Sequence, residues 1–137
     1  MHSERSGDRI RVPLSIAFAV LAAVVPVLIA LQLFLVGLAV FSDAAAWDAH
    51  RAVGGTIALP VLALAVAATV VPGLRRFRSL ALALLGLYAM QFVWLIAGRE
   101  AGSGAVQSLH AANAMALAVT GLALARRCTP ARRRAGG

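Results

Sequence analysis

The chain has 137 residues, enough for one domain, and 61% of them are hydrophobic, against roughly 45–50% in soluble domains. A chain of this size cannot cover so much apolar surface with its own core, so the composition excludes an ordinary soluble domain and favours a membrane protein. The net charge of +8 comes from thirteen basic residues, all of them arginine, against five acidic residues. Most lie in short segments between and beyond the apolar runs and are not interleaved with aromatic residues, which argues against nucleic-acid binding. Cys128 is the only cysteine, so an intramolecular disulfide is excluded.

Four apolar runs follow one another and predict four transmembrane helices in a single all-α domain over residues 1–137. Their approximate ranges are 12–41, 43–72, 77–98 and 104–126. The first run, as a helix of about thirty residues, spans about 45 Å against a bilayer core of about 30 Å. We therefore expect this helix to tilt, bend or protrude, with Pro26 as a kink site. The run is too long for the apolar region of a cleaved signal peptide, which is usually about 7–15 residues, and Met1 to Arg11 form a polar tail before it.

The connections carry signals for helix starts and ends. Ser42 and Asp43 offer an N-cap for the second helix, and Ser103 offers one for the fourth. Pro60 lies inside the second helix, which the Pro-Gly pair at 72–73 ends. A short arginine-rich loop then leads into the third helix.

The arginines fall mainly on one side of the predicted bundle. The N-terminal tail, the second connection and the C-terminal segment together carry eleven, and the opposite side carries two, Arg51 and Arg99. The positive-inside rule then places both termini in the cytoplasm. The absence of lysine and the abundance of alanine favour a bacterial source, and hence the bacterial cytoplasmic membrane. Four helices with short connections predict an up-down-up-down bundle of two tandem helix hairpins.

The two hairpins resemble one another. Gln32 precedes His50 by 18 residues, and Gln91 precedes His110 by 19. Each histidine also follows a predicted cap, Asp43 or Ser103, by seven residues. Both halves run in the same direction, so the repeat implies a pseudo-two-fold axis along the membrane normal. Coincidence in a sequence rich in alanine and leucine is the competing explanation.

The repeat predicts that two histidines and two glutamines share one layer, roughly 10–13 Å below the helix ends. Such a layer is costly inside a membrane unless its members are paired, ligated or functional. Singly, His50 and His110 are also explained as interfacial or hydrogen-bonded side chains, and Gln32 and Gln91 as hydrogen-bond glue between helices. Trp47, Trp94 and Tyr88 are interpreted as belt or packing residues.

Two neutral imidazoles on facing helices are suited to the two axial positions of a haem iron. Gly54 and Ala114 each follow a histidine by four residues, on its own helix face, and are small enough for a flat macrocycle. Arg51 and Arg99 are candidates for pairing with haem propionates. A zinc or copper site is the weaker alternative, because only Asp48 is available as a third ligand.

A resemblance to known proteins rests on two sequence segments. These are Gln32…Gly37…His50-Arg51…Gly54 and Gln91…His110…Asn113-Ala114. The pattern resembles an uncharacterised family of small four-helix bacterial membrane proteins, and it is more distantly similar to one half of the haem A synthase fold. That similarity implies one haem held by His50 and His110, with Gln32, Gln91 and Asn113 beside it. The paired outer-loop cysteines and the loop glutamate of the synthase have no counterpart here, so haem hydroxylation is not implied.

The leading hypothesis is therefore a small b-type cytochrome that binds haem b and transfers electrons to or from a quinone or a redox membrane protein. The alternative is a cofactor-free structural or accessory subunit of a larger membrane complex. A membrane enzyme that uses a histidine and Asp48 as acid and base is a third possibility, with no motif in its favour. Oligomerisation is open under each of them.

Overall fold

The computed structural model of the chain describes residues 4–129, with side chains described from residue 14. Its elements are α1 (Glu4–Phe41), α2 (Ala46–Thr56), α3 (Ala58–Val70), η1 (Pro72–Phe77), α4 (Arg78–Glu100) and α5 (Gly104–Cys128). η1 is a 3₁₀ helix. α2 and α3 together form one span, which is interrupted only at Ile57. The predicted all-α four-helix bundle is confirmed.

Four helical segments are long and apolar enough to span a membrane. They are Leu14–Phe41, Ala46–Val70, Pro72–Glu100 and Gly104–Cys128. Large apolar side chains point outwards from them, with exposed fractions of 67% at Val27, 64% at Phe34 and 73% at Leu59. So much outward apolar surface is unfavourable in water, whereas contact with lipid hydrocarbon is favourable. The chain is a multi-pass membrane protein.

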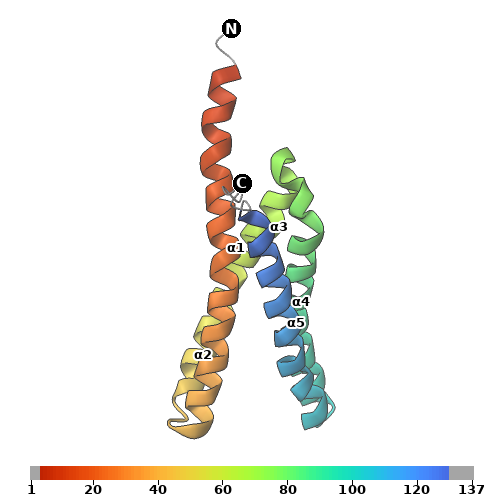
Figure 1. Cartoon of the computed structure of the whole chain (residues 1–137). Coiled ribbons are helices and arrows are strands. Elements are labelled where there is room, and N and C mark those ends of the chain that lie inside the picture. The colour runs from red at the N-terminus through yellow and green to blue at the C-terminus, as the bar shows by residue number, and fades with distance from the viewer. Residues whose placement is uncertain (1–3, 130–137) are drawn as a thin grey trace, which may run out of the picture.

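The helices pack as two pairs that share one core. α2 lies against α1, and α4 lies against α5, while α1 contacts α5 and α3 contacts α4. In Figure 1 the two pairs diverge towards the end of the bundle that holds the turns at 42–45 and 101–103. The opposite end, near η1, is where α3 brings them together. The bundle is therefore closed at one end and looser at the other.

The core is a stripe of buried residues spaced three and four apart, the spacing of one helix face. On α1 it comprises Phe18, Ala22, Val25 and Ile29, and on the second span it comprises Ile57, Val61, Leu64 and Ala68. Leu74 and Phe77 of η1, Ala81 and Leu84 of α4, and Leu117 and Leu124 of α5 complete it. All these residues lie in the half of the bundle towards η1. The buried residues of the other half, among them Leu35, Ala39 and Ala46, lie outside this cluster.

The predicted starts of two helices, α1 and α2, differ from the structure, and a third is confirmed. α1 begins at Glu4, so part of the expected polar tail is helical. The predicted cap at Ser42 and Asp43 is wrong: α2 begins at Ala46, and the Asp43 carboxylate accepts instead from the Ala45 N–H at 2.9 Å. By contrast, the cap at Ser103 is confirmed, since its hydroxyl accepts from the Val106 N–H.

The second span is interrupted at Ile57, a break that was not predicted. Pro60 lies three residues later. It has no N–H to donate to the carbonyl of Thr56, and its ring crowds that carbonyl, so the helix ladder is weakened one turn before the proline. Thr56 instead turns its hydroxyl back to the carbonyl of Val53 at 2.8 Å. The break leaves backbone carbonyls near Gly54 open to other partners.

α4 and α5 approach closely beside their connection. A Cβ atom added to Gly98 would touch Gln107 Cγ and would lie 2.6 Å from the backbone nitrogen of Gln107. Gly102 makes the turn with φ +58°, in the left-handed region that glycine adopts without strain. This end of the second hairpin therefore depends on residues without side chains.

We expect Gly98→Ala to lower the free energy of unfolding by about 1–3 kcal/mol, because the backbone of α5 must move to admit the methyl group. Gly86→Ala is the matched control, since Gly86 is exposed on the same helix and an added Cβ has nothing within 4 Å. Unfolding in mixed detergent micelles measures both. Equal stability of the two variants would contradict the close approach.

Candidate functional site

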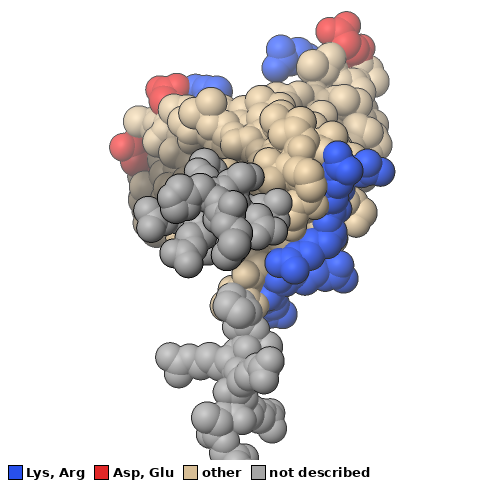
Figure 2. Space-filling view, turned by 90° about the horizontal axis from the view of Figure 1, so that it is seen from above, with Lys and Arg blue, Asp and Glu red and all other residues tan. Residues whose placement is uncertain are grey.

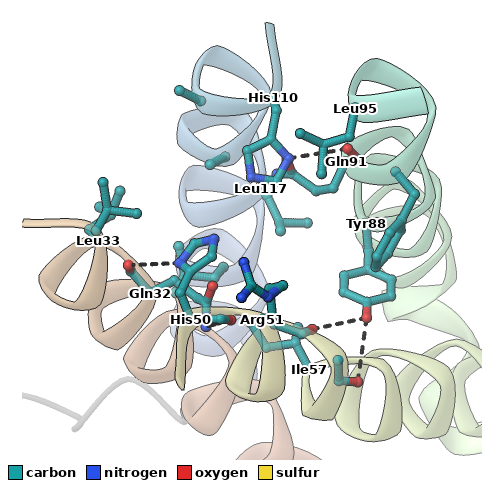
Figure 3. A pocket seen from close by; sticks show the side chains of 17 residues that line it. Gln32, Leu33, His50, Arg51, Ile57, Tyr88, Gln91, Leu95, His110 and Leu117 are labelled. Carbon is teal, nitrogen blue, oxygen red and sulfur yellow. Dashed lines mark hydrogen bonds between the residues drawn. The ribbon is translucent and has the colours of Figure 1, made fainter. Parts of the chain in front are cut away.

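The core stripe continues into the divergent half of the bundle, but its residues change in character. His50 and Gly54 continue it from Ile57 on the second span, and His110 and Ala114 continue it from Leu117 on α5. Gln32 on α1, with Tyr88 and Gln91 on α4, stands at the matching positions. Small and polar residues thus replace large apolar ones. They enclose a cavity of about 410 Å³ between the two hairpins (Figure 3).

His50 is held by Gln32 of the neighbouring helix in its own hairpin. The ring Nδ1 lies 3.3 Å from the backbone oxygen of Gln32, and the side-chain nitrogen of Gln32 donates to the backbone oxygen of His50 at 3.0 Å. Each residue therefore contacts the main chain of the other. Gly54 leaves room for this pair, since a Cβ there would lie 3.4 Å from Oε1 of Gln32.

The same arrangement recurs in the second hairpin. Nδ1 of His110 lies 3.1 Å from the backbone oxygen of Gln91. The neighbours of the Gln91 amide orient its nitrogen towards the backbone oxygen of His110, at 2.9 Å. Its oxygen then accepts from the Ala114 N–H at 3.1 Å and from Asn113 Nδ2 at 3.2 Å. Both hairpins thus carry one reciprocal glutamine–histidine pair.

The contact with a backbone carbonyl bears on the tautomer of each ring. A backbone carbonyl only accepts hydrogen bonds, so the imidazole nitrogen that faces it carries the proton. The Gln91 amide nitrogen is also 2.8 Å from Nδ1 of His110, a contact that alone would favour a lone pair there. For His50 the carbonyl of Gln32 therefore favours the proton on Nδ1, whereas Nδ1 of His110 faces both a carbonyl and an amide donor. Nε2 of the neutral His50 ring then keeps its lone pair.

The pairs bring the two rings together across the bundle. The ring centroids of His50 and His110 are 6.5 Å apart, and the ring planes are inclined by 68°. The edge of Trp47 contacts His50, with ring centroids 5.5 Å apart. Both histidines are half-buried and line the cavity (Figure 3). The prediction that the histidines share one layer agrees with this geometry.

Tyr88 is a cavity residue that the sequence interpretation assigned to packing. Its hydroxyl donates to the backbone oxygen of Gly54 at 3.0 Å, which ties α4 to the helix break near Ile57 (Figure 3). One signal was present in the sequence: a tyrosine in the middle of a span needs a partner for its hydroxyl. The identity of that partner depends on the break at Ile57, which the sequence did not indicate.

The remaining predicted site residues divide between the cavity and its surroundings. The cavity is lined by Gln32, His50, Arg51, Gly54, Gln91, His110 and Ala114. Arg51 pairs with Asp48 one turn earlier on the exposed side of α2. Asn113 does not line the cavity, and its side-chain nitrogen donates to the backbone oxygen of Leu87 at 2.8 Å. Arg99 is not among the residues that line the cavity.

Among the side chains of residues 14–129, no three of histidine, cysteine, aspartate or glutamate stand close enough together to hold a metal ion. Asp48, the third ligand considered for zinc or copper, is engaged with Arg51. The two histidines thus supply at most two ligands.

Residues 32–98, just under half of the chain, match the sequence profile of a family of unknown function (DUF6220). No curated protein and no solved structure matches the chain. The matched segment contains the first glutamine–histidine pair and Gln91, and it ends before His110. The resemblance to an uncharacterised family is thereby supported over this segment, and the distant similarity to haem A synthase stays a prediction.

We expect Gln32→Leu and Gln91→Leu each to lower the free energy of unfolding by about 0.6 kcal/mol, and by at most about 1.7 kcal/mol, as for other hydrogen bonds between membrane helices. The double variant should lose the sum of the two, because each pair lies within its own hairpin. Ser108→Ala is the control, since Ser108 Oγ donates to the backbone oxygen of Gly104 within one exposed helix turn. Strong non-additivity would contradict two independent pairs.

Proposed function

We propose that the chain is a small membrane b-type cytochrome-like protein that binds one haem b between His50 and His110 and transfers electrons. The observation that carries the proposal is the pair of half-buried imidazoles, 6.5 Å apart, whose Nδ1 atoms are both turned to backbone carbonyls. In metal sites the ligating histidine commonly donates its other ring N–H to a carbonyl, which fixes the tautomer and the ring orientation.

The separation of the rings supports one shared ion. Since a bond from a metal to an imidazole nitrogen is about 2.0–2.1 Å long, two rings on opposite sides of one ion have their centroids roughly 6–6.5 Å apart. The observed distance of 6.5 Å fits that value. With no third protein ligand found among the side chains of residues 14–129, a group held by both histidines would have to supply its remaining ligands itself. A macrocycle with four nitrogens supplies them.

The cavity supports a ligand of this kind. Its volume of about 410 Å³ lies within the range of roughly 300–1,000 Å³ usual for ligand sites. On α2 and α5 the cavity is lined by residues with small side chains or none: Gly54, Gly55, Ala111 and Ala114. Arg51 is the one cation that lines it, at the end near the turns.

A bound haem supplies an iron that exchanges one electron. The residues of this chain then do three things. His50 and His110 would hold the iron, the carbonyls of Gln32 and Gln91 would orient the rings, and the surrounding apolar side chains would exclude water. The two histidine ligands, their orientation and the exclusion of water would together set the reduction potential of the iron.

The site sits near the end of the bundle that carries Asp43, Asp48 and Glu100, whereas five arginines gather at the other end of the described helices. Under the positive-inside rule the arginine end, with both chain termini, faces the cytoplasm of a bacterial cell. The haem then lies towards the outer leaflet. Its redox partner is a quinone in the bilayer or a larger redox membrane protein.

A cofactor-free structural or accessory subunit is the second candidate. It is favoured by one observation: among the described residues, no buried side-chain nitrogen or oxygen lacks a hydrogen-bond partner. The enclosed polar atoms of the layer thus find their hydrogen-bond partners within the chain itself. In that case the outward apolar faces serve to pack against a larger membrane complex.

We expect the protein purified after haem-replete expression to show a Soret band at roughly 410–430 nm. His50→Ala and His110→Ala should each lose or strongly weaken the band, because one axial ligand is gone, and free imidazole should restore it. His2→Ala, which changes the third histidine of the chain, is the control. A colourless wild-type protein, or alanine variants with an unchanged spectrum, would contradict the haem proposal and favour the accessory subunit.

The position of Arg51 predicts a preference for ligands that carry carboxylates. Arg51→Gln should weaken binding of iron protoporphyrin IX by about three- to tenfold, a modest effect because the side chain is 69% exposed and its charge is screened. Binding of the dimethyl ester, which has no free carboxylate, should not change. Arg99→Gln is the control, and absorption titrations give both affinities. Equal losses for the acid and the ester would show that Arg51 acts only on the shape of the cavity.

A further inference from the structure

A group of arginines lies at the end of the bundle away from the cavity. Arg75 and Arg76 belong to η1, Arg78 begins α4, and Arg126 and Arg127 lie in the last turn of α5. Figure 2 shows blue side chains joined in one patch along an edge of the molecule, with no red side chain beside them. We call these five residues the arginine patch. They come from two segments that are 48 or more residues apart in the sequence.

The arginine patch has no acidic partner among the described side chains. Asp43, Asp48 and Glu100 stand at the other end of the helices, and the ion pair found among described residues joins Asp48 to Arg51. All five guanidinium side chains belong to exposed residues. Like charges held together repel one another, so an external anion stabilises such a patch.

The chain beneath the patch is well anchored. Leu74 and Phe77 of η1 are only 3% and 5% exposed and belong to the core cluster. The guanidinium carbon of Arg76 lies 4.7 Å from the centre of the Phe77 ring, which itself stacks on Phe18. The backbone that carries three of the arginines is therefore fixed before any ligand arrives, and less freedom is lost on binding.

The surroundings of the patch are apolar and face lipid. Val70 at the end of α3 is 62% exposed, and Leu82 and Leu122, near the same ends of α4 and α5, are 45% and 41% exposed. A ligand there meets guanidinium groups at the helix ends and apolar side chains one turn deeper. That combination matches a phosphate headgroup with acyl chains, and it does not match free phosphate.

We propose that the arginine patch binds the headgroup phosphate of an anionic phospholipid. Guanidinium groups bind phosphate through paired hydrogen bonds. Basic segments directly beside transmembrane helices attract anionic lipids of the surrounding leaflet. A lipid with two phosphates engages arginines of both η1 and α5 and is retained best. Such a lipid holds the α3–α4 connection to the end of α5, at the closed end of the bundle.

The test measures the lipids that stay with the protein. The whole protein is reconstituted in phosphatidylcholine with equal small fractions of phosphatidylglycerol and cardiolipin, and retained lipids are counted by native mass spectrometry. The wild type should retain the anionic lipids over phosphatidylcholine, with cardiolipin first. The variant with Arg75, Arg76, Arg126 and Arg127 changed to Gln should lose at least about fivefold of that retention. Arg51→Gln with Arg99→Gln, which changes the charge at the other end, should keep it.

Two further measurements keep the outcome decisive. If the fourfold variant does not fold, a salt titration of the wild type replaces it, and retention should fall as ionic strength rises. Inorganic phosphate at millimolar concentration should not displace the lipid, because the acyl chains also bind. Equal retention of anionic and zwitterionic lipid, loss in the Arg51 and Arg99 variant, salt-independent retention, or displacement by inorganic phosphate would each overturn the proposal.

Discussion

The divergent half of this bundle depends on two reciprocal contacts, Gln32 with His50 and Gln91 with His110. A polar side chain inside a membrane needs a partner that is always present, and the backbone of a neighbouring helix provides one. Because each pair lies within one hairpin, neither pair needs the other hairpin for its hydrogen bonds. The hydrogen bond from Tyr88 to Gly54 joins the two hairpins nearer the middle of the bundle, and beyond it they diverge. The cavity is the space that this separation leaves.

The closed half shows the opposite arrangement. There the helices contact one another through large apolar side chains such as Val25, Leu64 and Leu84, all fully buried. Gly121 brings α5 against α1, since a Cβ there would lie 3.4 Å from Val25. The same helix faces thus carry two kinds of contact. In the closed half apolar side chains pack the two hairpins together, and in the divergent half each glutamine–histidine pair joins the two helices of one hairpin.

Much of the fold could be predicted, because each span is an apolar run longer than a bilayer is thick. The depth of the histidines could also be predicted, because helix rise converts sequence spacing into distance. The break at Ile57 could not be predicted. It depends on whether the carbonyl of Thr56, to which Pro60 cannot donate, finds another hydrogen-bond donor. Without the break, the contact between Tyr88 and Gly54 could not be foreseen either. The direction of the two glutamine amides is equally absent from the sequence, because it is decided by neighbours on other helices.

The two candidate functions make different demands on the free edge of each imidazole. A purely structural layer needs every buried polar group to have a partner, and an asparagine or glutamine meets that need as well as a histidine does. In this bundle the histidines spend Nδ1 on a carbonyl, and no described residue donates a hydrogen bond to Nε2 of either ring. Both rings line the same cavity, 6.5 Å apart. A ring edge that faces the cavity without a hydrogen-bond donor contributes nothing to helix packing. The choice of histidine at both positions therefore accords with the proposal that the two rings hold a ligand between them.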